Sequence, residues 1–133
     1  MEDNQVLRKD NFEIKIYHIP GHTNGHIAFH FFKEKKIFTG DTLFSLGCGR
    51  IFEGTHEQMF CSLKRLSILP KETEIFCGHE YTLQNSNFCL ANDPKNLKLK
   101  EKIIEIKKNV KNNLPSIPTK LSDELELNIF LKA

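Results

Sequence analysis

The chain has 133 residues, of which 39% are hydrophobic and 27% are charged, and its formal net charge is +2. This composition is ordinary for one globular domain, and so small a charge gives no reason to expect nucleic acid as a partner. No apolar run approaches the roughly 18 residues of a membrane-spanning helix, so no membrane partner is expected either. The polar residues 1–5 do not form a signal peptide, and the 4 cysteines form no C-x-x-C pair, so we expect a cytoplasmic protein with reduced thiols.

The first half of the chain predicts strands that are joined by turns. Residues 12–17 alternate apolar and polar side chains, which predicts a strand that ends at Pro20-Gly21. Residues 27–32 and 37–39 predict two further strands with a polar connection between them. Residues 40–54 are rich in glycine and predict a long loop, and loops of that length usually carry function.

The second half predicts mainly helices. Thr55 and Gln58 form a capping-box pattern, which predicts a helix that begins at Thr55 and ends before Pro70. The remaining expected elements are a short strand at 73–77, helices at 82–91 and 98–110, and an apolar segment at 125–131 whose state the pattern leaves open.

Three side chains that can bind metal follow expected strands. His22 comes after the Pro-Gly turn, Asp41 follows Gly40, and His79 follows a strand and a glycine. Open sheets place their sites at strand ends, and histidine and carboxylate are common zinc ligands. A carboxylate can also bridge two ions, so the three residues together predict a dinuclear metal site. Each residue alone has a structural alternative, as a hydrogen-bonded histidine or as a turn aspartate.

Other side chains have weaker functional interpretations. Arg50 and Tyr81 flank the expected metal residues and could bind an anionic substrate, or could form structural pairs. Cys48 could be a nucleophile, but it has no histidine beside it in sequence and is more simply a small loop residue. The lysines of 95–111 are interrupted by glutamates, which favours a solvated helix face over a nucleic-acid site.

With these residues in view, the chain resembles glyoxalase II, the hydroxyacylglutathione hydrolase of the metallo-β-lactamase superfamily. His22, Asp41 and His79 would by themselves indicate only the superfamily. The long loop at 40–54 and the run His79-Glu80-Tyr81-Thr82 narrow the resemblance to glyoxalase II. The matching motifs are Pro20-Gly21-His22-Thr23 with Gly25-His26, then Gly40-Asp41-Thr42-Leu43-Phe44 through Gly47-Cys48-Gly49-Arg50 and Phe52-Glu53-Gly54, then Gly78-His79-Glu80-Tyr81-Thr82 with Asn85.

The resemblance implies an α/β (α+β) fold. Residues 1–81 would form the C-terminal half of a metallo-β-lactamase αββα sandwich, and residues 82–133 would form part of a helical C-terminal domain. The implied reaction is hydrolysis of the thioester S-D-lactoylglutathione to glutathione and D-lactate at a dinuclear metal site. Zinc is the expected metal, and iron or manganese would also suit these ligands.

The resemblance also implies a role for each candidate residue. His22 would bind the first metal, Asp41 would bridge both metals, and His79 would bind the second, so these three are the expected catalytic residues. Arg50 and Tyr81 would help to hold the glutathione moiety of the substrate.

The N-terminal T-H-x-H-x-D-H motif of the family, which supplies four further ligands, is absent from the chain. Catalytic zinc usually has three protein ligands, and each expected ion here would have two. We therefore expect a truncated or split hydrolase that binds zinc weakly and has little activity without its N-terminal half, and a separate N-terminal half-chain is a candidate partner. Two alternatives stay open: a non-catalytic remnant or interaction module of this fold, and a nuclease of the superfamily that uses the lysine-rich stretch.

Overall fold

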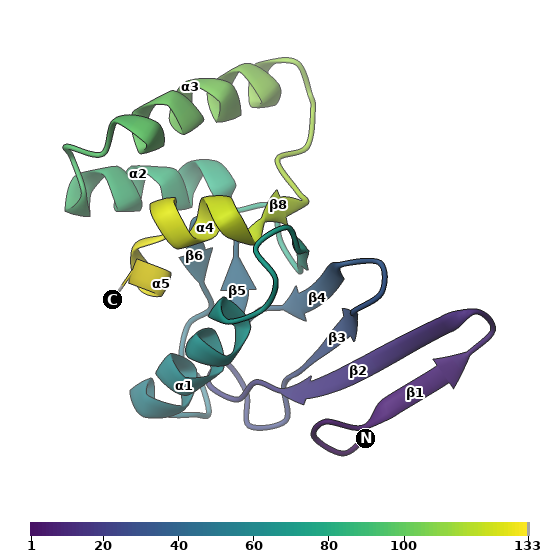
Figure 1. Cartoon of the computed structure of the whole chain (residues 1–133). Helices are drawn as coiled ribbons and strands as arrows, with labels where there is room; N and C mark the ends of the chain where they lie inside the picture. The colour runs from purple at the N-terminus through teal and green to yellow at the C-terminus, as the bar shows by residue number, and fades with distance from the viewer. Residues whose placement is uncertain (133) are drawn as a thin grey trace.

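Six strands form one mixed sheet in the order β1-β2-β3-β4-β7-β8 (Figure 1). The computed structural model describes residues 1–132. The strands are β1 (Val6–Lys9), β2 (Phe12–His18), β3 (Ile27–Phe31), β4 (Lys36–Gly40), β7 (Glu74–Cys77) and β8 (Thr119–Lys120). Neighbouring strands pair antiparallel except β4 and β7, which are parallel. The strands predicted at 12–17, 27–32, 37–39 and 73–77 are thus confirmed to within one or two residues, whereas β1 and β8 were not predicted.

The segment that was predicted as a long loop contains a small hairpin. Strands β5 (Leu43–Phe44) and β6 (Gly47–Cys48) pair antiparallel, and Ser45 and Leu46 form the turn between them. The expectation of a loop throughout 40–54 was therefore wrong for 43–48. The reason is that each strand has only two residues, which is too short for alternation to show in the sequence.

Five helices complete the described part of the chain. They are α1 (His56–Ser67), α2 (Thr82–Asn92), α3 (Leu97–Lys111), α4 (Leu121–Leu127) and α5 (Ile129–Lys132). The predicted capping box is confirmed, because the Thr55 side chain accepts from the Gln58 amide and the Gln58 side chain accepts from the Thr55 amide. The segment 125–131, whose state the sequence left open, is helical apart from Asn128 between α4 and α5. No helix among residues 1–132 is both long and apolar enough to span a membrane.

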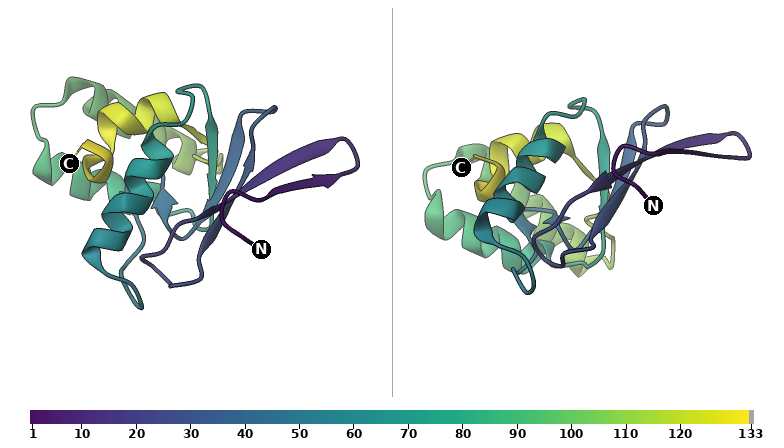
Figure 2. Two further views of the ribbon diagram at one scale, coloured as in Figure 1. Left: turned by 60° about the horizontal axis from the view of Figure 1, so that its bottom comes forward. Right: turned by 90° about the horizontal axis from the view of Figure 1, so that it is seen from below.

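Two hydrophobic clusters hold these elements together. In the first, Tyr17, Ala28, Ile37 and Ile75 from one face of the sheet pack against residues of α1, α4 and α5. Figure 2 shows the helices gathered on one side of the sheet. In the second, α2, α3 and α4 pack around the buried side chain of Leu46. The observed mixture of sheet and helices confirms the α+β fold class.

The opposite face of the sheet carries a row of phenylalanines. Side chains alternate between the two faces along a strand, so the neighbours of the core residues point the other way. Ring centroids are 5.6 Å apart for Phe12 and Phe31, 5.6 Å for Phe31 and Phe38, and 5.0 Å for Phe38 and Phe76. The exposed fractions are 46% for Phe12 and 42% for Phe38, while Phe31 and Phe76 are half-buried, so this aromatic face is partly open to solvent.

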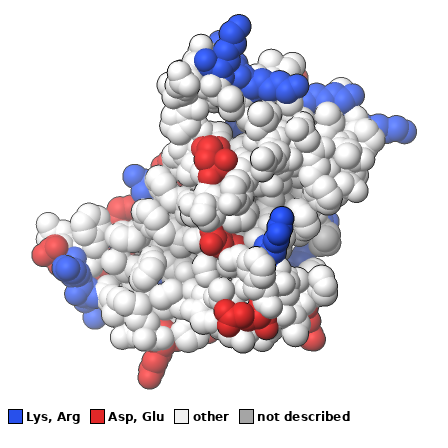
Figure 3. Space-filling view, turned by 180° about the vertical axis from the view of Figure 1, so that it is seen from behind, with Lys and Arg blue, Asp and Glu red and all other residues white. Residues whose placement is uncertain are grey.

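The lysines of 95–111 lie along α3 except for Lys95, which precedes it, and Lys and Arg side chains gather there at the top of Figure 3. Some of them pair with acids: Lys98 forms ion pairs with Asp123 and Glu126, and the Lys102 ammonium lies 3.6 Å from the Glu105 carboxylate. These pairs support the interpretation of α3 as a solvated helix with mixed charges.

His30 gives the fold a pH dependence. Its side chain is buried in the sheet with its Nδ1 3.3 Å from the Tyr17 hydroxyl, and burial, together with the nearby Lys15, lowers the pKa of His30 below its ordinary value of 6.5. The unfolded chain then binds this proton more tightly, so the free energy of unfolding falls as the pH drops below about 6.5. Urea denaturation between pH 5 and 7 should therefore show a smaller pH dependence for His30→Gln than for the unaltered protein. His56→Gln, at an exposed histidine, is the control, and equal slopes for all three proteins would contradict the prediction.

Candidate active site

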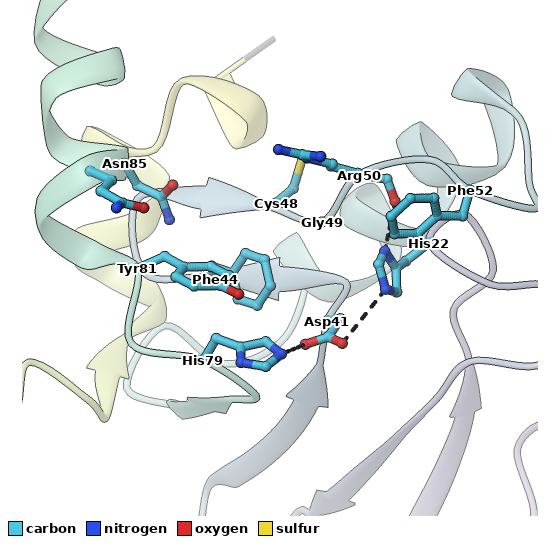
Figure 4. A pocket seen from close by; sticks show the side chains of 11 residues that line it. His22, Asp41, Phe44, Cys48, Gly49, Arg50, Phe52, His79, Tyr81 and Asn85 are labelled. Carbon is cyan, nitrogen blue, oxygen red and sulfur yellow. Dashed lines mark hydrogen bonds and ion pairs between the residues drawn. The ribbon is translucent and has the colours of Figure 1, made fainter.

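The three predicted metal ligands meet at one edge of the sheet. Strands β4 and β7 are parallel neighbours, so their carboxyl ends bring Asp41 close to His79, and the turn after β2 brings His22 to the other side of Asp41. The Nε2 atom of His22 is 3.6 Å from Oδ2 of Asp41, and Nε2 of His79 is 3.1 Å from Oδ1 (Figure 4). Each oxygen of one carboxylate thus faces a different imidazole.

The ring of His22 is oriented by the loop that precedes α1. Its Nδ1 lies 2.7 Å from the backbone carbonyl of Arg50. A carbonyl can only accept a hydrogen bond, so Nδ1 carries a proton, and in the neutral ring the nitrogen that could bind a metal is Nε2, which faces Asp41. A backbone or carboxylate partner of this kind is typical of histidines that bind metal.

Asp41 is positioned by neighbours that the sequence analysis left without a role. Its amide donates to Nε2 of His26 over 2.9 Å. A Cβ atom added at Gly78 would lie 2.6 Å from Oδ1 of Asp41, and one added at Gly49 would lie 1.8 Å from the Asp41 carbonyl oxygen. Both glycines are therefore needed for the close approach of the surrounding loops to Asp41.

The donor atoms suit transition metals in their chemistry. Imidazole nitrogen and carboxylate oxygen are ligands for zinc, iron and manganese alike. His22 with Asp41 forms one pair of donors, and His79 with Asp41 forms a second pair. Among residues 1–132, however, no three His, Cys, Asp or Glu side chains converge as a group that could hold an ion. The residues present therefore fit a dinuclear site in which each ion would have two donors, with Asp41 shared between the ions.

All five predicted site residues line one cavity of about 630 Å³. A volume in this range is typical of sites for small molecules. The other residues around the cavity are Phe44, Cys48, Gly49, Phe52, Gln84 and Asn85. The structure thus brings the predicted residues together, while the roles assigned to them stay predictions.

Aromatic rings contact both histidines, and the sequence did not predict these contacts. The ring of Tyr81 stacks on that of His79 with centroids 4.9 Å apart, and Phe44 lies edge-on to Tyr81 at 5.3 Å. On the other side of the cavity, Phe52 contacts His22 at 5.0 Å. No local pattern in the sequence marks the contacts of Phe44 and Phe52, because they join residues that are far apart along the chain.

The segment that carries His79 and Tyr81 is tied to the region ahead of β8. The Glu80 carboxylate accepts hydrogen bonds from the Thr82 hydroxyl over 2.8 Å and from the Ser116 amide over 3.2 Å. These bonds restrain the backbone on both sides of Tyr81 and so help to fix the floor of the cavity.

Cys48 lines the same cavity, but its environment does not favour a nucleophile. Burial raises the pKa of the Cys48 thiol to about 11. Since the thiolate is the reactive form of cysteine, this thiol is protonated and weakly nucleophilic near neutral pH. The structure thereby favours the simpler interpretation of Cys48 as a loop residue.

Comparison with known proteins agrees with this arrangement. The profile of the metallo-beta-lactamase superfamily matches residues 5–79, and the profile described as hydroxyacylglutathione hydrolase C-terminus matches residues 80–133. A protein of Pelagibacter ubique (strain HTCC1062) called hydroxyacylglutathione hydrolase is 56% identical over 131 residues, which are 98% of this chain and 55% of that protein. The chain spans about half the length of the curated relatives it matches, since the share is 51% for a relative from Aeromonas hydrophila.

Solved structures show the same fold. The BLEG-1 B3 metallo-beta-lactamase superposes with a TM-score of 0.68 at 21% identity, over all of this chain and 48% of that one. TTHA1623, which was solved in a di-iron-bound form, has a TM-score of 0.51 at 37% identity and covers 59% of this chain and 39% of its own. The predicted resemblance is confirmed: the chain belongs to the metallo-β-lactamase superfamily, within which it corresponds to the C-terminal part of the hydroxyacylglutathione hydrolases, or glyoxalase II proteins.

Proposed function

We propose that this chain supplies the C-terminal part of a metal-dependent hydroxyacylglutathione hydrolase, which cleaves S-D-lactoylglutathione into glutathione and D-lactate. The observation that carries the proposal is the Asp41 carboxylate, whose two oxygens face His22 and His79 at 3.6 Å and 3.1 Å inside the cavity. The names of the relatives support the same reaction. Residues 1–81 would contribute the ligands, and residues 82–133 would close the cavity from the helical side.

In this proposal His22 and Asp41 hold one metal ion, and Asp41 and His79 hold the other. Bound metals would polarise the thioester carbonyl and lower the pKa of water, so that a nucleophile exists at neutral pH. Zinc is the proposed metal, and iron stays an alternative because TTHA1623 was solved with two iron ions. Manganese suits the same ligand types.

The chain's own residues would bind and orient the substrate. Arg50 lines the cavity and offers a planar group of donors that matches the carboxylates of glutathione. The Tyr81 ring stacks on His79, so its hydroxyl is held at a fixed place in the cavity where it can hydrogen-bond the peptide part of the substrate. Phe44 contacts the His79 ring and Phe52 contacts the His22 ring, so both would restrict the positions of the histidine rings.

The remaining metal ligands would come from polypeptide outside these 133 residues. Two donors for each ion fall short of the three that catalytic zinc usually has. A second cavity, of about 420 Å³, extends from Phe29, Phe38 and Phe76 on the aromatic face to His26 and Gly78 beside Asp41. A polypeptide that covers the aromatic face could therefore reach the metal site, whether it belongs to the same protein or to a separate N-terminal chain.

The proposal can be tested by complementation. The purified chain would be mixed with the part of the Pelagibacter ubique protein that lies outside its match to this chain. We expect the chain alone to retain little zinc after desalting and to show little turnover, and the mixture to hold near two zinc ions and hydrolyse S-D-lactoylglutathione. Elemental analysis and a thioester assay measure these outcomes.

Two outcomes would contradict different claims of the proposal, the need for further metal ligands and the hydrolase activity. Stoichiometric metal and turnover in the chain alone would overturn the need for further ligands. A mixture that forms a complex but neither binds zinc nor hydrolyses the thioester would overturn the hydrolase and favour an interaction module, for which the open aromatic face is the supporting observation.

A further inference from the structure

The hairpin formed by β5 and β6 is a wall of the cavity. Phe44 and Cys48 from this hairpin line the cavity, and the Phe44 ring lies 5.3 Å from Tyr81 and 6.1 Å from His79 (Figure 4). The hairpin therefore bounds one side of the space that the rings of Tyr81 and His79 occupy.

The turn of this hairpin has a backbone that needs support from its surroundings. Leu46 has a φ of 61°, in the left-handed region that residues other than glycine seldom adopt unless neighbouring structure holds them there. The turn is also buried, with Leu46 fully inaccessible to solvent, so water cannot satisfy its amide and carbonyl groups.

Two side chains of the last helical region bind the turn. Oε1 of Glu124 accepts a hydrogen bond from the Leu46 amide over 2.7 Å. The side-chain amide of Asn128 donates to the Gly47 carbonyl over 3.1 Å and to Oε1 of Glu124 over 3.0 Å. Glu124 and Asn128 are both 0% exposed. We call these two residues the turn clamp.

The clamp is itself anchored. Oε2 of Glu124 accepts from the hydroxyl of Thr119 over 2.9 Å, and the Asn128 side-chain carbonyl accepts from the Phe130 amide over 3.0 Å. Burying a carboxylate is costly unless donors surround it, as they do here. The pKa of Glu124 is raised chiefly by burial, while its hydrogen-bond donors and Lys102 act in the opposite direction. Because burial of this carboxyl group is costly, its presence here indicates that its hydrogen bond to the Leu46 amide is needed to hold the turn.

We infer that Glu124 and Asn128 are positioning residues of the candidate active site. By holding the turn at Leu46, they keep Phe44 against Tyr81 and thereby fix Tyr81 and His79 for the glutathione moiety. The substrate named here rests on the proposed function, whereas the effect of the clamp on the aromatic rings does not. A clamp that served only the stability of the core would leave the position of Phe44 unchanged when it was removed.

The chemistry of the clamp allows a conservative rescue. A glutamine at 124 can accept from Leu46 and Asn128 through its carbonyl, and can donate to Thr119 because a hydroxyl both donates and accepts. Glu124→Gln should therefore keep the clamp, while Glu124→Leu leaves the Leu46 amide without a partner. Glu126→Gln is the matched control, since Glu126 lies on the same helix with its side chain 58% exposed.

The test measures the turn and the rings directly by NMR. In Glu124→Leu we expect hydrogen exchange at the Leu46 amide to rise by about tenfold or more, and contacts between the Phe44 and Tyr81 rings to weaken. Glu124→Gln and Glu126→Gln should stay within about twofold of the unaltered chain. Unchanged Leu46 exchange and unchanged ring contacts in a folded Glu124→Leu would overturn the inference.

A second variant and a ligand titration extend this test. If Glu124→Leu does not fold, Thr119→Val removes one anchor of Glu124 with little change in volume. Hydrogen exchange at the Leu46 amide should then rise about threefold, and an unchanged rate would overturn the inference.

Titration with S-methylglutathione then separates the inference about the clamp from the proposed function. A loss of its binding in Glu124→Leu but not in Glu124→Gln supports the clamp. A failure of every form to bind it counts against the proposed substrate, and the exchange and ring data still decide the clamp.

Discussion

Asp41→Asn is expected to remove metal binding and thioester hydrolysis from the complemented protein. Asparagine has nearly the same shape but no charge, and one of its two terminal atoms is an NH2 group that cannot bind a metal. Because the two Asp41 oxygens face different histidines, one donor pair loses its oxygen ligand and the other keeps only a neutral amide oxygen in place of the carboxylate. Changes to partners that only support metal ligands already cost about 10–100-fold, so we expect turnover to fall by more than about 100-fold.

The measurement is the zinc content and thioester turnover of the mixture with the complementing part of the Pelagibacter ubique protein. Asp10→Asn is the matched control, because Asp10 is exposed, has a φ of 53°, and asparagine tolerates that backbone conformation well. Asp10→Asn should leave both quantities unchanged. An Asp41→Asn protein that kept its zinc and its turnover would show that Asp41 is a structural residue and not a shared ligand.

Gly49→Ala is expected to destabilise the fold and distort the site. The added Cβ atom would lie 1.8 Å from the carbonyl oxygen of Asp41, so one of the two backbone segments must move. The amide of Gly49 also donates to the Thr42 carbonyl over 3.1 Å, and that bond would be strained by the movement. Overpacking of this kind costs about 1–3 kcal/mol and sometimes more, and we expect the upper part of that range because the clash is with backbone.

Urea denaturation followed by circular dichroism measures this loss. Gly25→Ala is the matched control, since a Cβ atom at Gly25 would meet nothing within 4 Å. Its free energy of unfolding should stay within about 0.5 kcal/mol of the unaltered value. A Gly49→Ala protein as stable as the Gly25→Ala protein would mean that the loop after β6 yields easily and that Gly49 is not needed for its close approach to Asp41.

The hairpin at 43–48, which lies between Asp41 and Gly49 in the chain, joins the two hydrophobic clusters. Its Leu43 side chain belongs to the cluster under the sheet, and its Leu46 side chain belongs to the cluster of α2, α3 and α4. Helix α2 contributes to the same turn, since Asn85 donates to the Ser45 carbonyl over 3.1 Å and the Cys89 thiol donates to the Leu46 carbonyl over 3.2 Å. The helices after residue 81 therefore shape the cavity without providing the predicted metal ligands.

The sequence by itself determined the features that depend on neighbours along the chain. Alternating side chains predicted β2, short strand-like segments between turns predicted β3, β4 and β7, and the Thr55–Gln58 pattern predicted the start of α1, because strand pleating, turns and helix capping are local effects. The turn glycines and the residues that follow them identified His22, Asp41 and His79 as candidates, and the surrounding motifs identified the family.

Only the tertiary structure decided how these candidates meet and what holds them. The parallel pairing of β4 with β7 places Asp41 beside His79, the carbonyl of Arg50 orients His22 from 28 residues away, and Glu124 reaches the Leu46 amide across 78 residues. No local pattern encodes such contacts, because they form only when the sheet and the helices pack against each other and buried polar groups must find partners.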